Sequence, residues 1–325
     1  MHPRVSVLMI AYNREAFIAE AIESVLAQTF RDFELIIVDD GSQDATGEIA
    51  RHYAARDSRI RFHQNQKNLG QFPTRNYAAS LATGEFIKYH DSDDVMYPHC
   101  LAIMTELLAA YPQASLALSK EWEGGPLPML LTPRLCYERE FHGYGMFSLG
   151  PPSAMFRRDR FAKLGYFDLA GPHSDLAMWL RMCKTENVLL VPAGLYWYRI
   201  HAAQHLASPE AARDRAIINR KVWEALNAED CPLDAAGRTR AKNNWAWILA
   251  KGIYGDLRAG QFALAWFSYQ QCGLRVQDWF RYLRSPKRDR FAGTPRDENG
   301  DFLKSDWSAI IQASAKPKPD IWDPW

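Results

Sequence analysis

The stretch Gly84–Asp94, which reads GEFIKYHDSDD, decides the fold that this 325-residue sequence predicts. Residues 84–90 predict a β-strand, so Asp91, Asp93 and Asp94 follow at its C-terminal end. In open α/β sheets, ligands bind at that end of the strands. Crowded carboxylates repel one another unless a divalent cation such as Mg²⁺ or Mn²⁺ lies between them. An acidic cluster taken alone is more often a solvated turn, so the surrounding sequence has to decide.

Three more apolar runs have the length of buried strands and are too short for helices. They lie at residues 5–11, 33–38 and 60–63. Helical signals separate them. Apolar residues between Phe17 and Leu26 recur at helical spacing, and Pro73 suits the first turn of a helix that Gly84 closes. The expected fold class is therefore α/β, with a Rossmann-like, mainly parallel sheet and helices on both faces.

Two of these strands deliver pairs of aspartates to the same edge of the predicted sheet. Asp39 and Asp40 end the second strand, as Asp91 and Asp93 end the fourth, and residues 12–13 end the first strand at that edge. Solvated turns do not readily explain such a coincidence. The sequence therefore predicts a cation site that neutralises a diphosphate leaving group.

Composition and cysteine usage narrow the function classes. The chain is 47% hydrophobic and 24% charged, which is typical of a globular protein. Its net charge of +1 argues against a chain-wide nucleic-acid surface. The five cysteines are scattered and lack CxxC pairing, so neither a disulfide framework nor a zinc site is expected. Without a signal peptide or an apolar window of about 18 residues, the expected location is the cytoplasm.

Seven motifs, in the order in which they stand here, resemble family 2 glycosyltransferases with the GT-A fold. They are Val7–Asn13, Ser24–Gln28, Val38–Asp44, Asn68–Gly70, Arg75–Asn76, Ala82–Gly84 and Asp91–Asp94. The stretches 153–158 and 164–168 look like the family's acceptor-side strand and turn, and 175–181 and 198–201 complete the resemblance. It covers residues 4–205, and it implies a nucleotide-diphospho-sugar donor, with a UDP-sugar as the leading expectation.

The resemblance implies a set of residues that bind the nucleotide-sugar. Asp40 or its neighbour Asp39 would accept a hydrogen bond from the base, because a carboxylate accepts and never donates. Arg75 would reach the base or the diphosphate through its planar guanidinium. The full expected set is Ala11, Tyr12, Asn13, Asp39, Asp40, Arg75, Asp91 and Ser92. The alternatives are a surface salt bridge for Arg75, a turn or helix cap for Asp39, and simple strand termination for residues 12–13.

The resemblance also implies a divalent metal, Mn²⁺ or Mg²⁺. Asp93 would be its principal ligand, with Asp91 touching the ribose or the metal shell. His201 follows the expected strand 195–199 and is the third candidate ligand. A single histidine after an aromatic run is as often a structural residue, so both roles stay open for His201.

An inverting transfer needs a base on the face of the sugar opposite the leaving nucleotide. In the family this base is the Asp of a Glu-Asp pair about six residues before a helical arginine, and Asp175, before Arg181, matches that place. Ser174 stands where the glutamate is usual, so the acceptor site is expected to differ. A carboxylate at a helix N-terminus, stabilised by the helix dipole, is the alternative role for Asp175.

From residue 208 onward strand signals disappear, and the sequence predicts a helical region. Helices are expected at 211–226, 235–254 and 261–272, and eight of the eleven tryptophans lie between Trp223 and Trp325. The expected organisation is a GT-A catalytic domain at residues 1–207 and a tryptophan-rich accessory region at 208–325, which ends in an extended tail.

The segment 275–296 interleaves aromatic residues with seven basic ones, against Asp278 and Asp289. Such a pattern suits an anionic membrane surface, which predicts peripheral contact with the inner face of the membrane. Single-stranded nucleic acid is a second reading that we do not expect to hold, and a solvated face packed on the catalytic domain is a third.

The leading hypothesis is an inverting glycosyltransferase that extends a glycan or modifies a lipid-linked acceptor in polysaccharide biosynthesis. A non-catalytic sugar-nucleotide or glycan-binding module is the alternative, supported by the missing glutamate before Asp175. A sugar nucleotidyltransferase is less favoured, because residues 11–15 lack the glycine-rich phosphate loop that it requires. Residues 120–150 are expected to be irregular, and they carry no recognisable acceptor motif.

Overall fold

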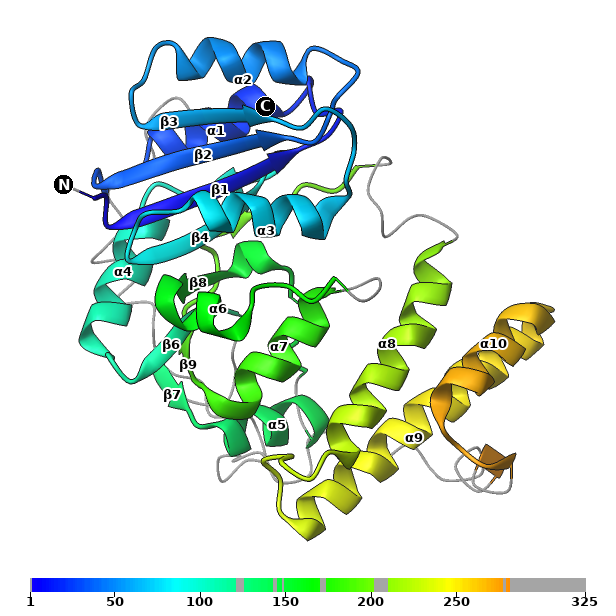
Figure 1. Ribbon diagram of the computed structural model, residues 1–325. Helices are drawn as coiled ribbons and strands as arrows, with labels where there is room; N and C mark the ends of the chain where they lie inside the picture. Colours follow the sequence, from blue (N-terminus) through cyan, green and yellow to red (C-terminus); the bar gives the residue numbers. More distant parts are fainter. Residues whose placement is uncertain are drawn as a thin grey trace, which may run out of the picture.

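A computed structural model describes residues 2–120, 126–142, 145–147, 149–169, 174–201, 210–276 and 279–280. An eight-stranded sheet with the order β3-β2-β1-β4-β8-β6-β9-β7 lies at its centre (Figure 1). The strands are β1 Val5–Ala11, β2 Phe33–Asp39, β3 Ile60–Gln64, β4 Phe86–Asp91, β6 Ala114–Ser119, β7 Met129–Leu131, β8 Ala154–Arg157 and β9 Asn187–Val191.

The predicted strands in the first 91 residues are all present and run parallel to one another. β1 pairs with β2 on one side and with β4 on the other, and β3 pairs with β2. β8 enters between β4 and β6 in the antiparallel direction, and β9 is again parallel to β6. The expected mainly parallel α/β sheet is therefore confirmed.

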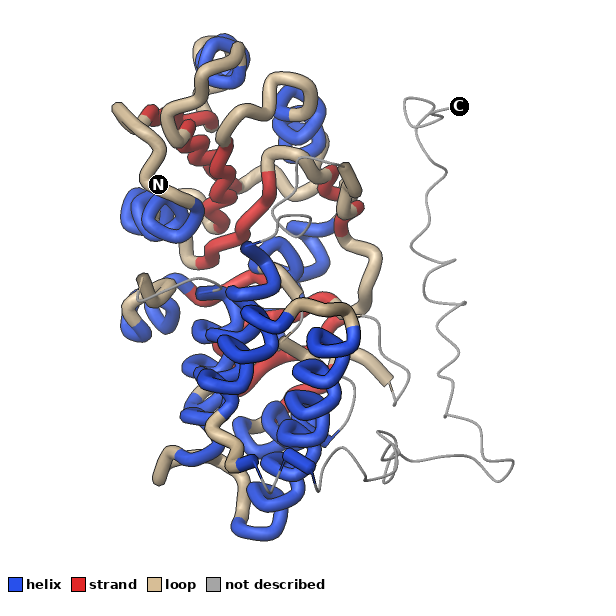
Figure 2. The backbone as a smooth tube through the Cα atoms, turned by 90° about the vertical axis from the view of Figure 1, so that its right-hand side faces the viewer, coloured by secondary structure: helices blue, strands red, loops and turns tan. Residues whose placement is uncertain are grey.

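Helices cover both faces of this sheet (Figure 2). They include α1 Ile18–Leu26, α2 Thr46–Ala54, α3 Gln71–Leu81, α4 Cys100–Ala110, α6 Arg158–Leu164 and α7 Ser174–Thr185. Side chains of β1 alternate between the two cores: Val5, Val7 and Met9 pack with α1 and α4, whereas Leu8 packs with α3 and α7. The period of two residues is what a strand buried on both faces requires.

The expectation that residues 120–150 are irregular is wrong for the described part of that stretch. β7 and a helix, α5 Pro133–His142, lie there. Strands β6 and β9 were also not predicted. The partners of β6 lie about 35–75 residues further along the chain, so these strands depend on tertiary pairing more than on local sequence.

Three helices follow the sheet domain, close to the positions expected from the sequence: α8 Glu210–Asn227, α9 Ala235–Arg258 and α10 Phe262–Cys272. α8 packs on α7, and α9 packs on α5. Val222, Leu226 and Ala241 belong to the same hydrophobic cluster as Leu8 and other sheet residues. The helical region therefore shares a core with the sheet. None of the helices in the described residues has the length and apolar character needed to cross a membrane.

Glu34 is a buried carboxylate that joins the starts of three strands. It accepts hydrogen bonds from Ser6 Oγ at 2.7 Å, from Thr83 N at 2.8 Å and from Arg61 Nη1 at 2.8 Å. Gly84 is needed beside this cluster, because a Cβ there would lie 2.7 Å from the backbone nitrogen of Ser6. Burial raises the pKa of Glu34, but the hydrogen bonds from Ser6, Arg61 and Thr83 outweigh it and hold the pKa below its usual value.

Replacing Glu34 by Gln should destabilise the fold by about 1–3 kcal/mol at pH 7, because one oxygen of this acceptor is exchanged for a donor. A depressed folded-state pKa adds stability above the ordinary glutamate pKa, and that stability is lost as the pH falls through the folded-state value. The difference between the two proteins in urea unfolding should therefore shrink toward acidic pH. The exposed Glu48→Gln is the control and should unfold like the parent; a constant difference at all pH values would contradict this account.

Candidate functional site

The carboxyl ends of β2, β1 and β4 bring the predicted site residues to one edge of the sheet. Ala11 lies opposite Asp39 in the β1–β2 register, and Ile10 lies opposite Asp91 in the β1–β4 register. Neighbouring strands are about 4.8 Å apart, so the backbones of Asp39 and Asp91 are separated by about 10 Å. The structure therefore gathers residues 11–14, 39–40 and 91–94 at this edge.

Asp39 and Asp40 are buried, and both carboxylates receive hydrogen bonds from within the chain. Asp39 accepts from the backbone and hydroxyl of Ser42 and from Gln64 Nε2 at 2.7 Å. Asp40 accepts from Asn65 Nδ2 at 2.7 Å and from the backbone nitrogens of residues 69 and 70, each at 3.0 Å. These two carboxylates therefore shape the loops after β2 and β3.

The turn after β1 is anchored to the loop after β2. Asn13 has a φ of 51°, a left-handed conformation that asparagine tolerates better than most residues. Its backbone nitrogen donates to Ser42 Oγ at 2.9 Å, and its side-chain oxygen accepts from the backbone of Gln43 at 2.9 Å. The neighbouring Tyr12 is exposed. This turn therefore presents Tyr12 to solvent beside the aspartates.

Arg75 is a buried cation, only 1% exposed, on α3. Its Nη2 donates to Asp91 Oδ1 at 2.7 Å, and its guanidinium lies over the ring of Tyr89, 5.3 Å from the ring centre. Its Nε and Nη1 have no hydrogen-bond partner among the residues that the structure describes. A surface salt bridge, the alternative reading of Arg75, is wrong. A buried guanidinium with unpartnered N–H groups is suited to an anionic or carbonyl oxygen.

Asp93 is held between two elements that are distant in sequence. Arg14 Nε donates to Asp93 Oδ2 at 2.9 Å, and His201 Nε2 lies 3.0 Å from the same oxygen. Arg14 also donates through Nη1 to the carbonyl oxygens of residues 12 and 13. Residues Asp91, Ser92, Asp93 and Asp94 form the acidic tetrad. Sequence reasoning missed Arg14, because only the register of β1 against β4 shows that the turn after β1 reaches this tetrad.

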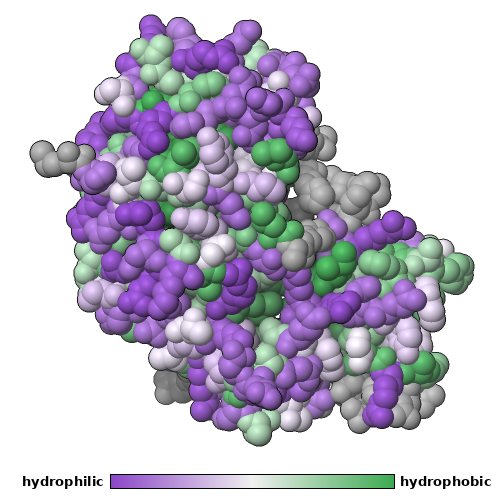
Figure 3. Space-filling model, viewed as in Figure 1, coloured by the Kyte–Doolittle hydropathy of each residue, from purple (hydrophilic) through white to green (hydrophobic). Residues whose placement is uncertain are grey.

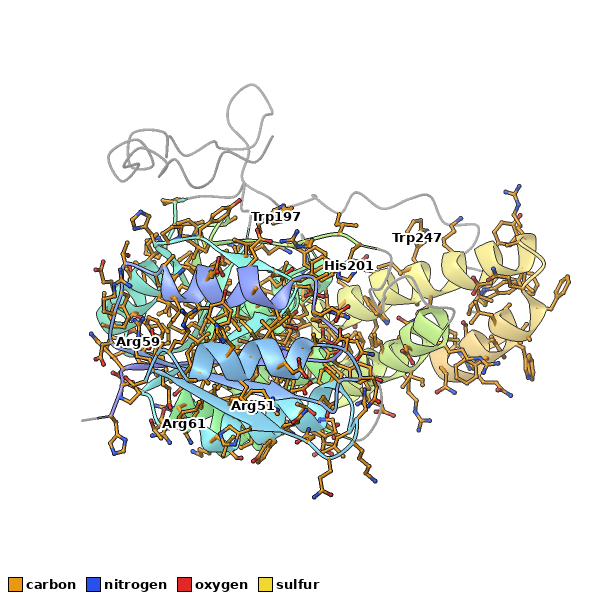
Figure 4. The ribbon with its side chains drawn as sticks, turned by 90° about the horizontal axis from the view of Figure 1, so that it is seen from above. Arg51, Arg59, Arg61, Trp197, His201 and Trp247 are labelled. Atoms are coloured by element: carbon orange, nitrogen blue, oxygen red, sulfur yellow. The ribbon has the colours of Figure 1, made fainter. Side chains whose placement is uncertain are left out.

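His201 ends a strap, residues 195–201, that crosses the tetrad. Part of the expected strand is confirmed: β10 Tyr196–Trp197 pairs with β5 Val95–Met96 in an antiparallel direction. In Figure 4, Trp197 and His201 lie on the opposite side of the N-terminal domain from Arg51 and Arg61.

Arg199 holds this strap against the tetrad and α1 through hydrogen bonds. Its backbone nitrogen donates to Asp94 Oδ1 at 3.1 Å, and its Nε donates to the carbonyl oxygen of Asp93 at 2.9 Å. Its Nη2 binds Glu20 of α1, and the guanidinium lies over the rings of Phe17 and Trp197. Sequence reasoning did not assign this role to Arg199, although the motif at 198–201 contained the signal.

Negative charge at the tetrad is only partly compensated within the described residues. Burial, followed by the charge of Asp91, raises the pKa of Asp94 to about 7, although the Arg199 N–H opposes this. Asp94 Oδ2 is buried and has no hydrogen-bond partner in the described part of the chain. Lys88 is buried on the same strand as Asp91, and burial lowers the pKa of its amine. A further cation near the tetrad would relieve the repulsion between these carboxylates.

The side chains near the tetrad that could bind a divalent cation are Asp93 and His201. No three His, Cys, Asp or Glu side chains in the described ranges converge on a ready-made metal site. Neighbouring ligands of an octahedral cation at about 2.1 Å lie about 3 Å apart, which matches the 3.0 Å between His201 Nε2 and Asp93 Oδ2. Mg²⁺ is commonly held by one or two carboxylates together with substrate phosphates. Asp93 and His201 are therefore close enough together to contact the same cation.

Asp175 lies in the first turn of α7. Its Oδ1 accepts from the backbone nitrogen of Leu176 at 2.8 Å, which fits a carboxylate at a helix N-terminus. Figure 1 places this end of α7 on the same side of the molecule as the carboxyl ends of β1 and β2. Asp175 therefore lies on a separate element from the aspartates of β2 and β4, and the side chain of Ser174 lies outside the described residues.

Comparison with known proteins relates this site to one family. Residues 6–163 match the model of "Glycosyl transferase family 2". An uncharacterized glycosyltransferase, EpsJ, of Bacillus subtilis is 43% identical over 106 residues, 33% of this chain and 30% of that protein. Glycosyltransferase GlyG of Streptococcus pneumoniae is 39% identical over 97 residues, 30% of this chain and 32% of that protein. The chain thus spans about a third of the length of the curated relatives it matches.

Solved structures confirm the fold. S. aureus TarS 1-349 in complex with UDP-GlcNAc has a TM-score of 0.59 at 21% identity, over 91% of this chain and 82% of that chain. A mannosyltransferase from Pyrobaculum calidifontis, in complex with GDP-Man and Mn²⁺, has a TM-score of 0.57 at 16% identity, over 87% of this chain and 84% of that chain. The expected GT-A architecture with a helical C-terminal region is therefore shown.

Replacing Arg199 by Gln should loosen the strap. Hydrogen bonds to charged groups contribute about 1.5–3 kcal/mol, so amide exchange at residues 196–200 should accelerate by about tenfold or more. Exchange in β1 and β2 should stay unchanged. Arg220→Gln, which removes an exposed ion pair with Glu224 at 2.9 Å, serves as the matched control. Equal exchange in the strap of both variants would show that Arg199 does not hold it.

Proposed function

Residues 6–163 belong to glycosyl transferase family 2, and from this premise we propose that the chain is an inverting glycosyltransferase. It moves a sugar from a nucleotide-diphospho-sugar, a UDP-sugar in the leading version, to a glycan or lipid-linked acceptor in polysaccharide biosynthesis. The observation that carries the proposal is the meeting of residues 11–14, 39–40 and 91–94 at one edge of a sheet of this family. Residues 1–207 are the catalytic domain, and 208–325 are an accessory region.

The donor is proposed to bind across the carboxyl ends of β1, β2 and β4. The binding set is Ala11, Tyr12, Asn13, Asp39, Asp40, Arg75, Asp91 and Ser92. Arg75 offers Nε and Nη1 without internal partners. Asp40 already receives three hydrogen bonds from the loop at 65–70, so it positions that loop, and any bond from the base goes to a remaining lone pair. Tyr12 is exposed at the same edge, where its ring provides an apolar surface for the base.

Asp93, Asp91 and His201 are the residues proposed to hold Mn²⁺ or Mg²⁺. A divalent cation bound there supplies positive charge for the departing diphosphate. Arg14 contacts the same Asp93 oxygen as His201, and Arg75 neutralises Asp91. The two arginines therefore orient both carboxylates and reduce their mutual repulsion.

Asp175 is proposed as the base that removes the proton of the acceptor hydroxyl. Its place at the start of α7, rather than on a strand of the donor site, suits a group that acts from the acceptor side. The proton transfers to the carboxylate as the new glycosidic bond forms and the bond to the diphosphate breaks.

The proposed location is the cytoplasm, with peripheral membrane contact through 275–296, most of which lies outside the described residues. All five cysteines are free and buried, which is the usual state in a reducing compartment.

Thermal melting against UDP-sugars and GDP-sugars, with Mn²⁺, Mg²⁺ or a chelator, tests the donor site. UDP-sugars should raise the melting temperature, and more so with metal, because the cation and the diphosphate bind together. Asp93→Asn should remove the metal-dependent part of the increase and keep the remainder. Asp57→Asn is the control, because Asp57 forms an ion pair with Arg59 and does not lie at this edge. It should respond to metal like the parent. A shift of the parent that is equally large with metal and with chelator would contradict the metal site, and a shift with GDP-sugars alone would contradict the UDP donor.

Replacing Asp175 by Asn should lower kcat by about 10²–10⁴, because a general base contributes that much, while donor affinity stays the same. Release of UDP in the presence of a glycan acceptor panel measures turnover, and calorimetry measures donor binding. Asp159→Asn, at the exposed start of α6, is the matched control and should retain activity. A variant at Asp175 with the turnover of the parent would exclude this residue as the base.

A further inference from the structure

Asn76 is the residue after Arg75 on α3, and it makes two hydrogen bonds with a distant part of the chain. Its Nδ2 donates to the carbonyl oxygen of Phe167 at 2.8 Å, and its Oδ1 accepts from the backbone nitrogen of Phe167 at 3.0 Å. An amide is the side-chain group that supplies a donor and an acceptor side by side. The side chain of Asn76 therefore pairs with both backbone groups of Phe167, as a neighbouring strand would.

The turn at residues 164–168, which contains this pairing site, has a backbone that needs support. Gly165 ends α6 with a φ of 83°, and Tyr166 follows with a φ of 59°. A left-handed conformation at tyrosine persists only where surrounding contacts hold it. Arg181 of α7 supplies such contacts, because its guanidinium donates to the carbonyl oxygens of residues 164 and 166. The turn is therefore bound to α3 through Asn76 and to α7 through Arg181.

The ring of Phe167 packs against the same residue as Arg75. Phe167 is 1% exposed, and its ring centre lies 5.5 Å from those of Phe72 on α3 and Tyr89 on β4. The guanidinium of Arg75 lies over the Tyr89 ring, and the Tyr89 hydroxyl donates to the backbone carbonyl of Arg75 at 3.2 Å. The core therefore places the turn and Arg75 on either side of one aromatic ring, and the two hydrogen bonds of Asn76 fix the backbone of the turn beside it.

We propose that Asn76 is a positioning residue that sets the place of α7 relative to Arg75. Successive residues of a helix point about 100° apart, so α3 directs Arg75 to Asp91 and directs Asn76 to the turn. Arg181 connects the turn to α7, and Asp175 lies in the first turn of that helix. Asn76 thereby fixes where the proposed base stands relative to the donor. The effect on turnover rests on the proposed function, whereas the link from α3 to α7 does not.

Hydrogen exchange measured by mass spectrometry, in the parent and in Asn76→Ala, tests this link without any ligand. In Figure 3 the border between α3 and α6 lies at the molecular surface, where apolar residues (green) show among polar ones (purple), so local opening there admits solvent. Residues 164–168 should exchange about tenfold or more faster in the variant, because two hydrogen bonds are lost. Exchange in α7 should also accelerate, whereas α3 and β1 should exchange as in the parent.

Asn227→Ala is the matched control, because Asn227 Nδ2 also donates to a backbone carbonyl, that of Trp223, at an exposed place on α8. Exchange in residues 164–168 should be the same in this variant and in the parent. Circular dichroism will show that each variant is folded. Unchanged exchange in residues 164–168 or in α7 of Asn76→Ala would overturn the proposal.

Asn76→Asp tests the two hydrogen bonds separately. The introduced carboxylate keeps an acceptor for the backbone nitrogen of Phe167 but offers no donor to the Phe167 carbonyl oxygen. At pH 8 residues 164–168 should therefore exchange faster than in the parent. As the pH falls toward 5 the carboxyl gains a proton that it can donate, so the ratio of variant to parent exchange at the same pH should approach one. A ratio that stays constant would contradict the bond to the carbonyl oxygen.

Turnover tests what the link does for the reaction. Asn76→Ala should lower kcat by about tenfold or more, because the base is no longer held in place. Its donor affinity, measured by calorimetry, should match the parent, since Arg75 and Asp91 keep their ion pair. An unchanged kcat in a variant with accelerated exchange would overturn the positioning role. A parent without turnover would overturn the proposed function instead, and the exchange measurement would still decide the link from α3 to α7.

Discussion

Repulsion among carboxylates at the ends of β2 and β4 is the constraint on which the rest of this structure depends. Each carboxylate has different hydrogen-bond or ion-pair partners. Asp40 receives two backbone N–H groups and an amide, Asp91 meets the buried Arg75, and Asp93 meets Arg14 and His201. Asp94 is left with an unpartnered oxygen and a pKa raised to about 7, chiefly by burial. The loops, the strap and α3 are all positioned by these contacts, so the acidic edge organises the molecule around it.

Much of the sheet could be predicted because its first four strands carry their signal locally. Each is a short apolar run that ends in polar residues, and parallel strands must bring those ends to one edge. The same rule predicts from the sequence that Asp39 and Asp91 lie at one edge of the sheet. The positions of α8, α9 and α10 could also be predicted, because residues such as Cys231-Pro232 interrupt helices and so mark their ends. The fold class and the position of the acidic edge can therefore be predicted from local sequence.

Other parts of the structure depend on contacts between distant residues, and local sequence does not contain them. β6 and β9 are defined by strands that come much later or earlier in the chain. Arg14 and Arg199 approach the tetrad from positions about 80 residues before it and 105 residues after it. A single sequence does not distinguish an exposed arginine from an arginine that contacts the site. The two differ in whether the fold brings a carboxylate or carbonyl oxygen within hydrogen-bonding distance.

The hydrophobic cluster shared by the sheet and the accessory region has a consequence for how this chain folds. Leu226 and Ala241 are fully buried in the same cluster as Trp179 of α7. Side chains that exclude water together lose that protection together, so α8 and α9 form one cooperative unit with the sheet. A chain that lacked α8 and α9 would expose part of this shared interior to water.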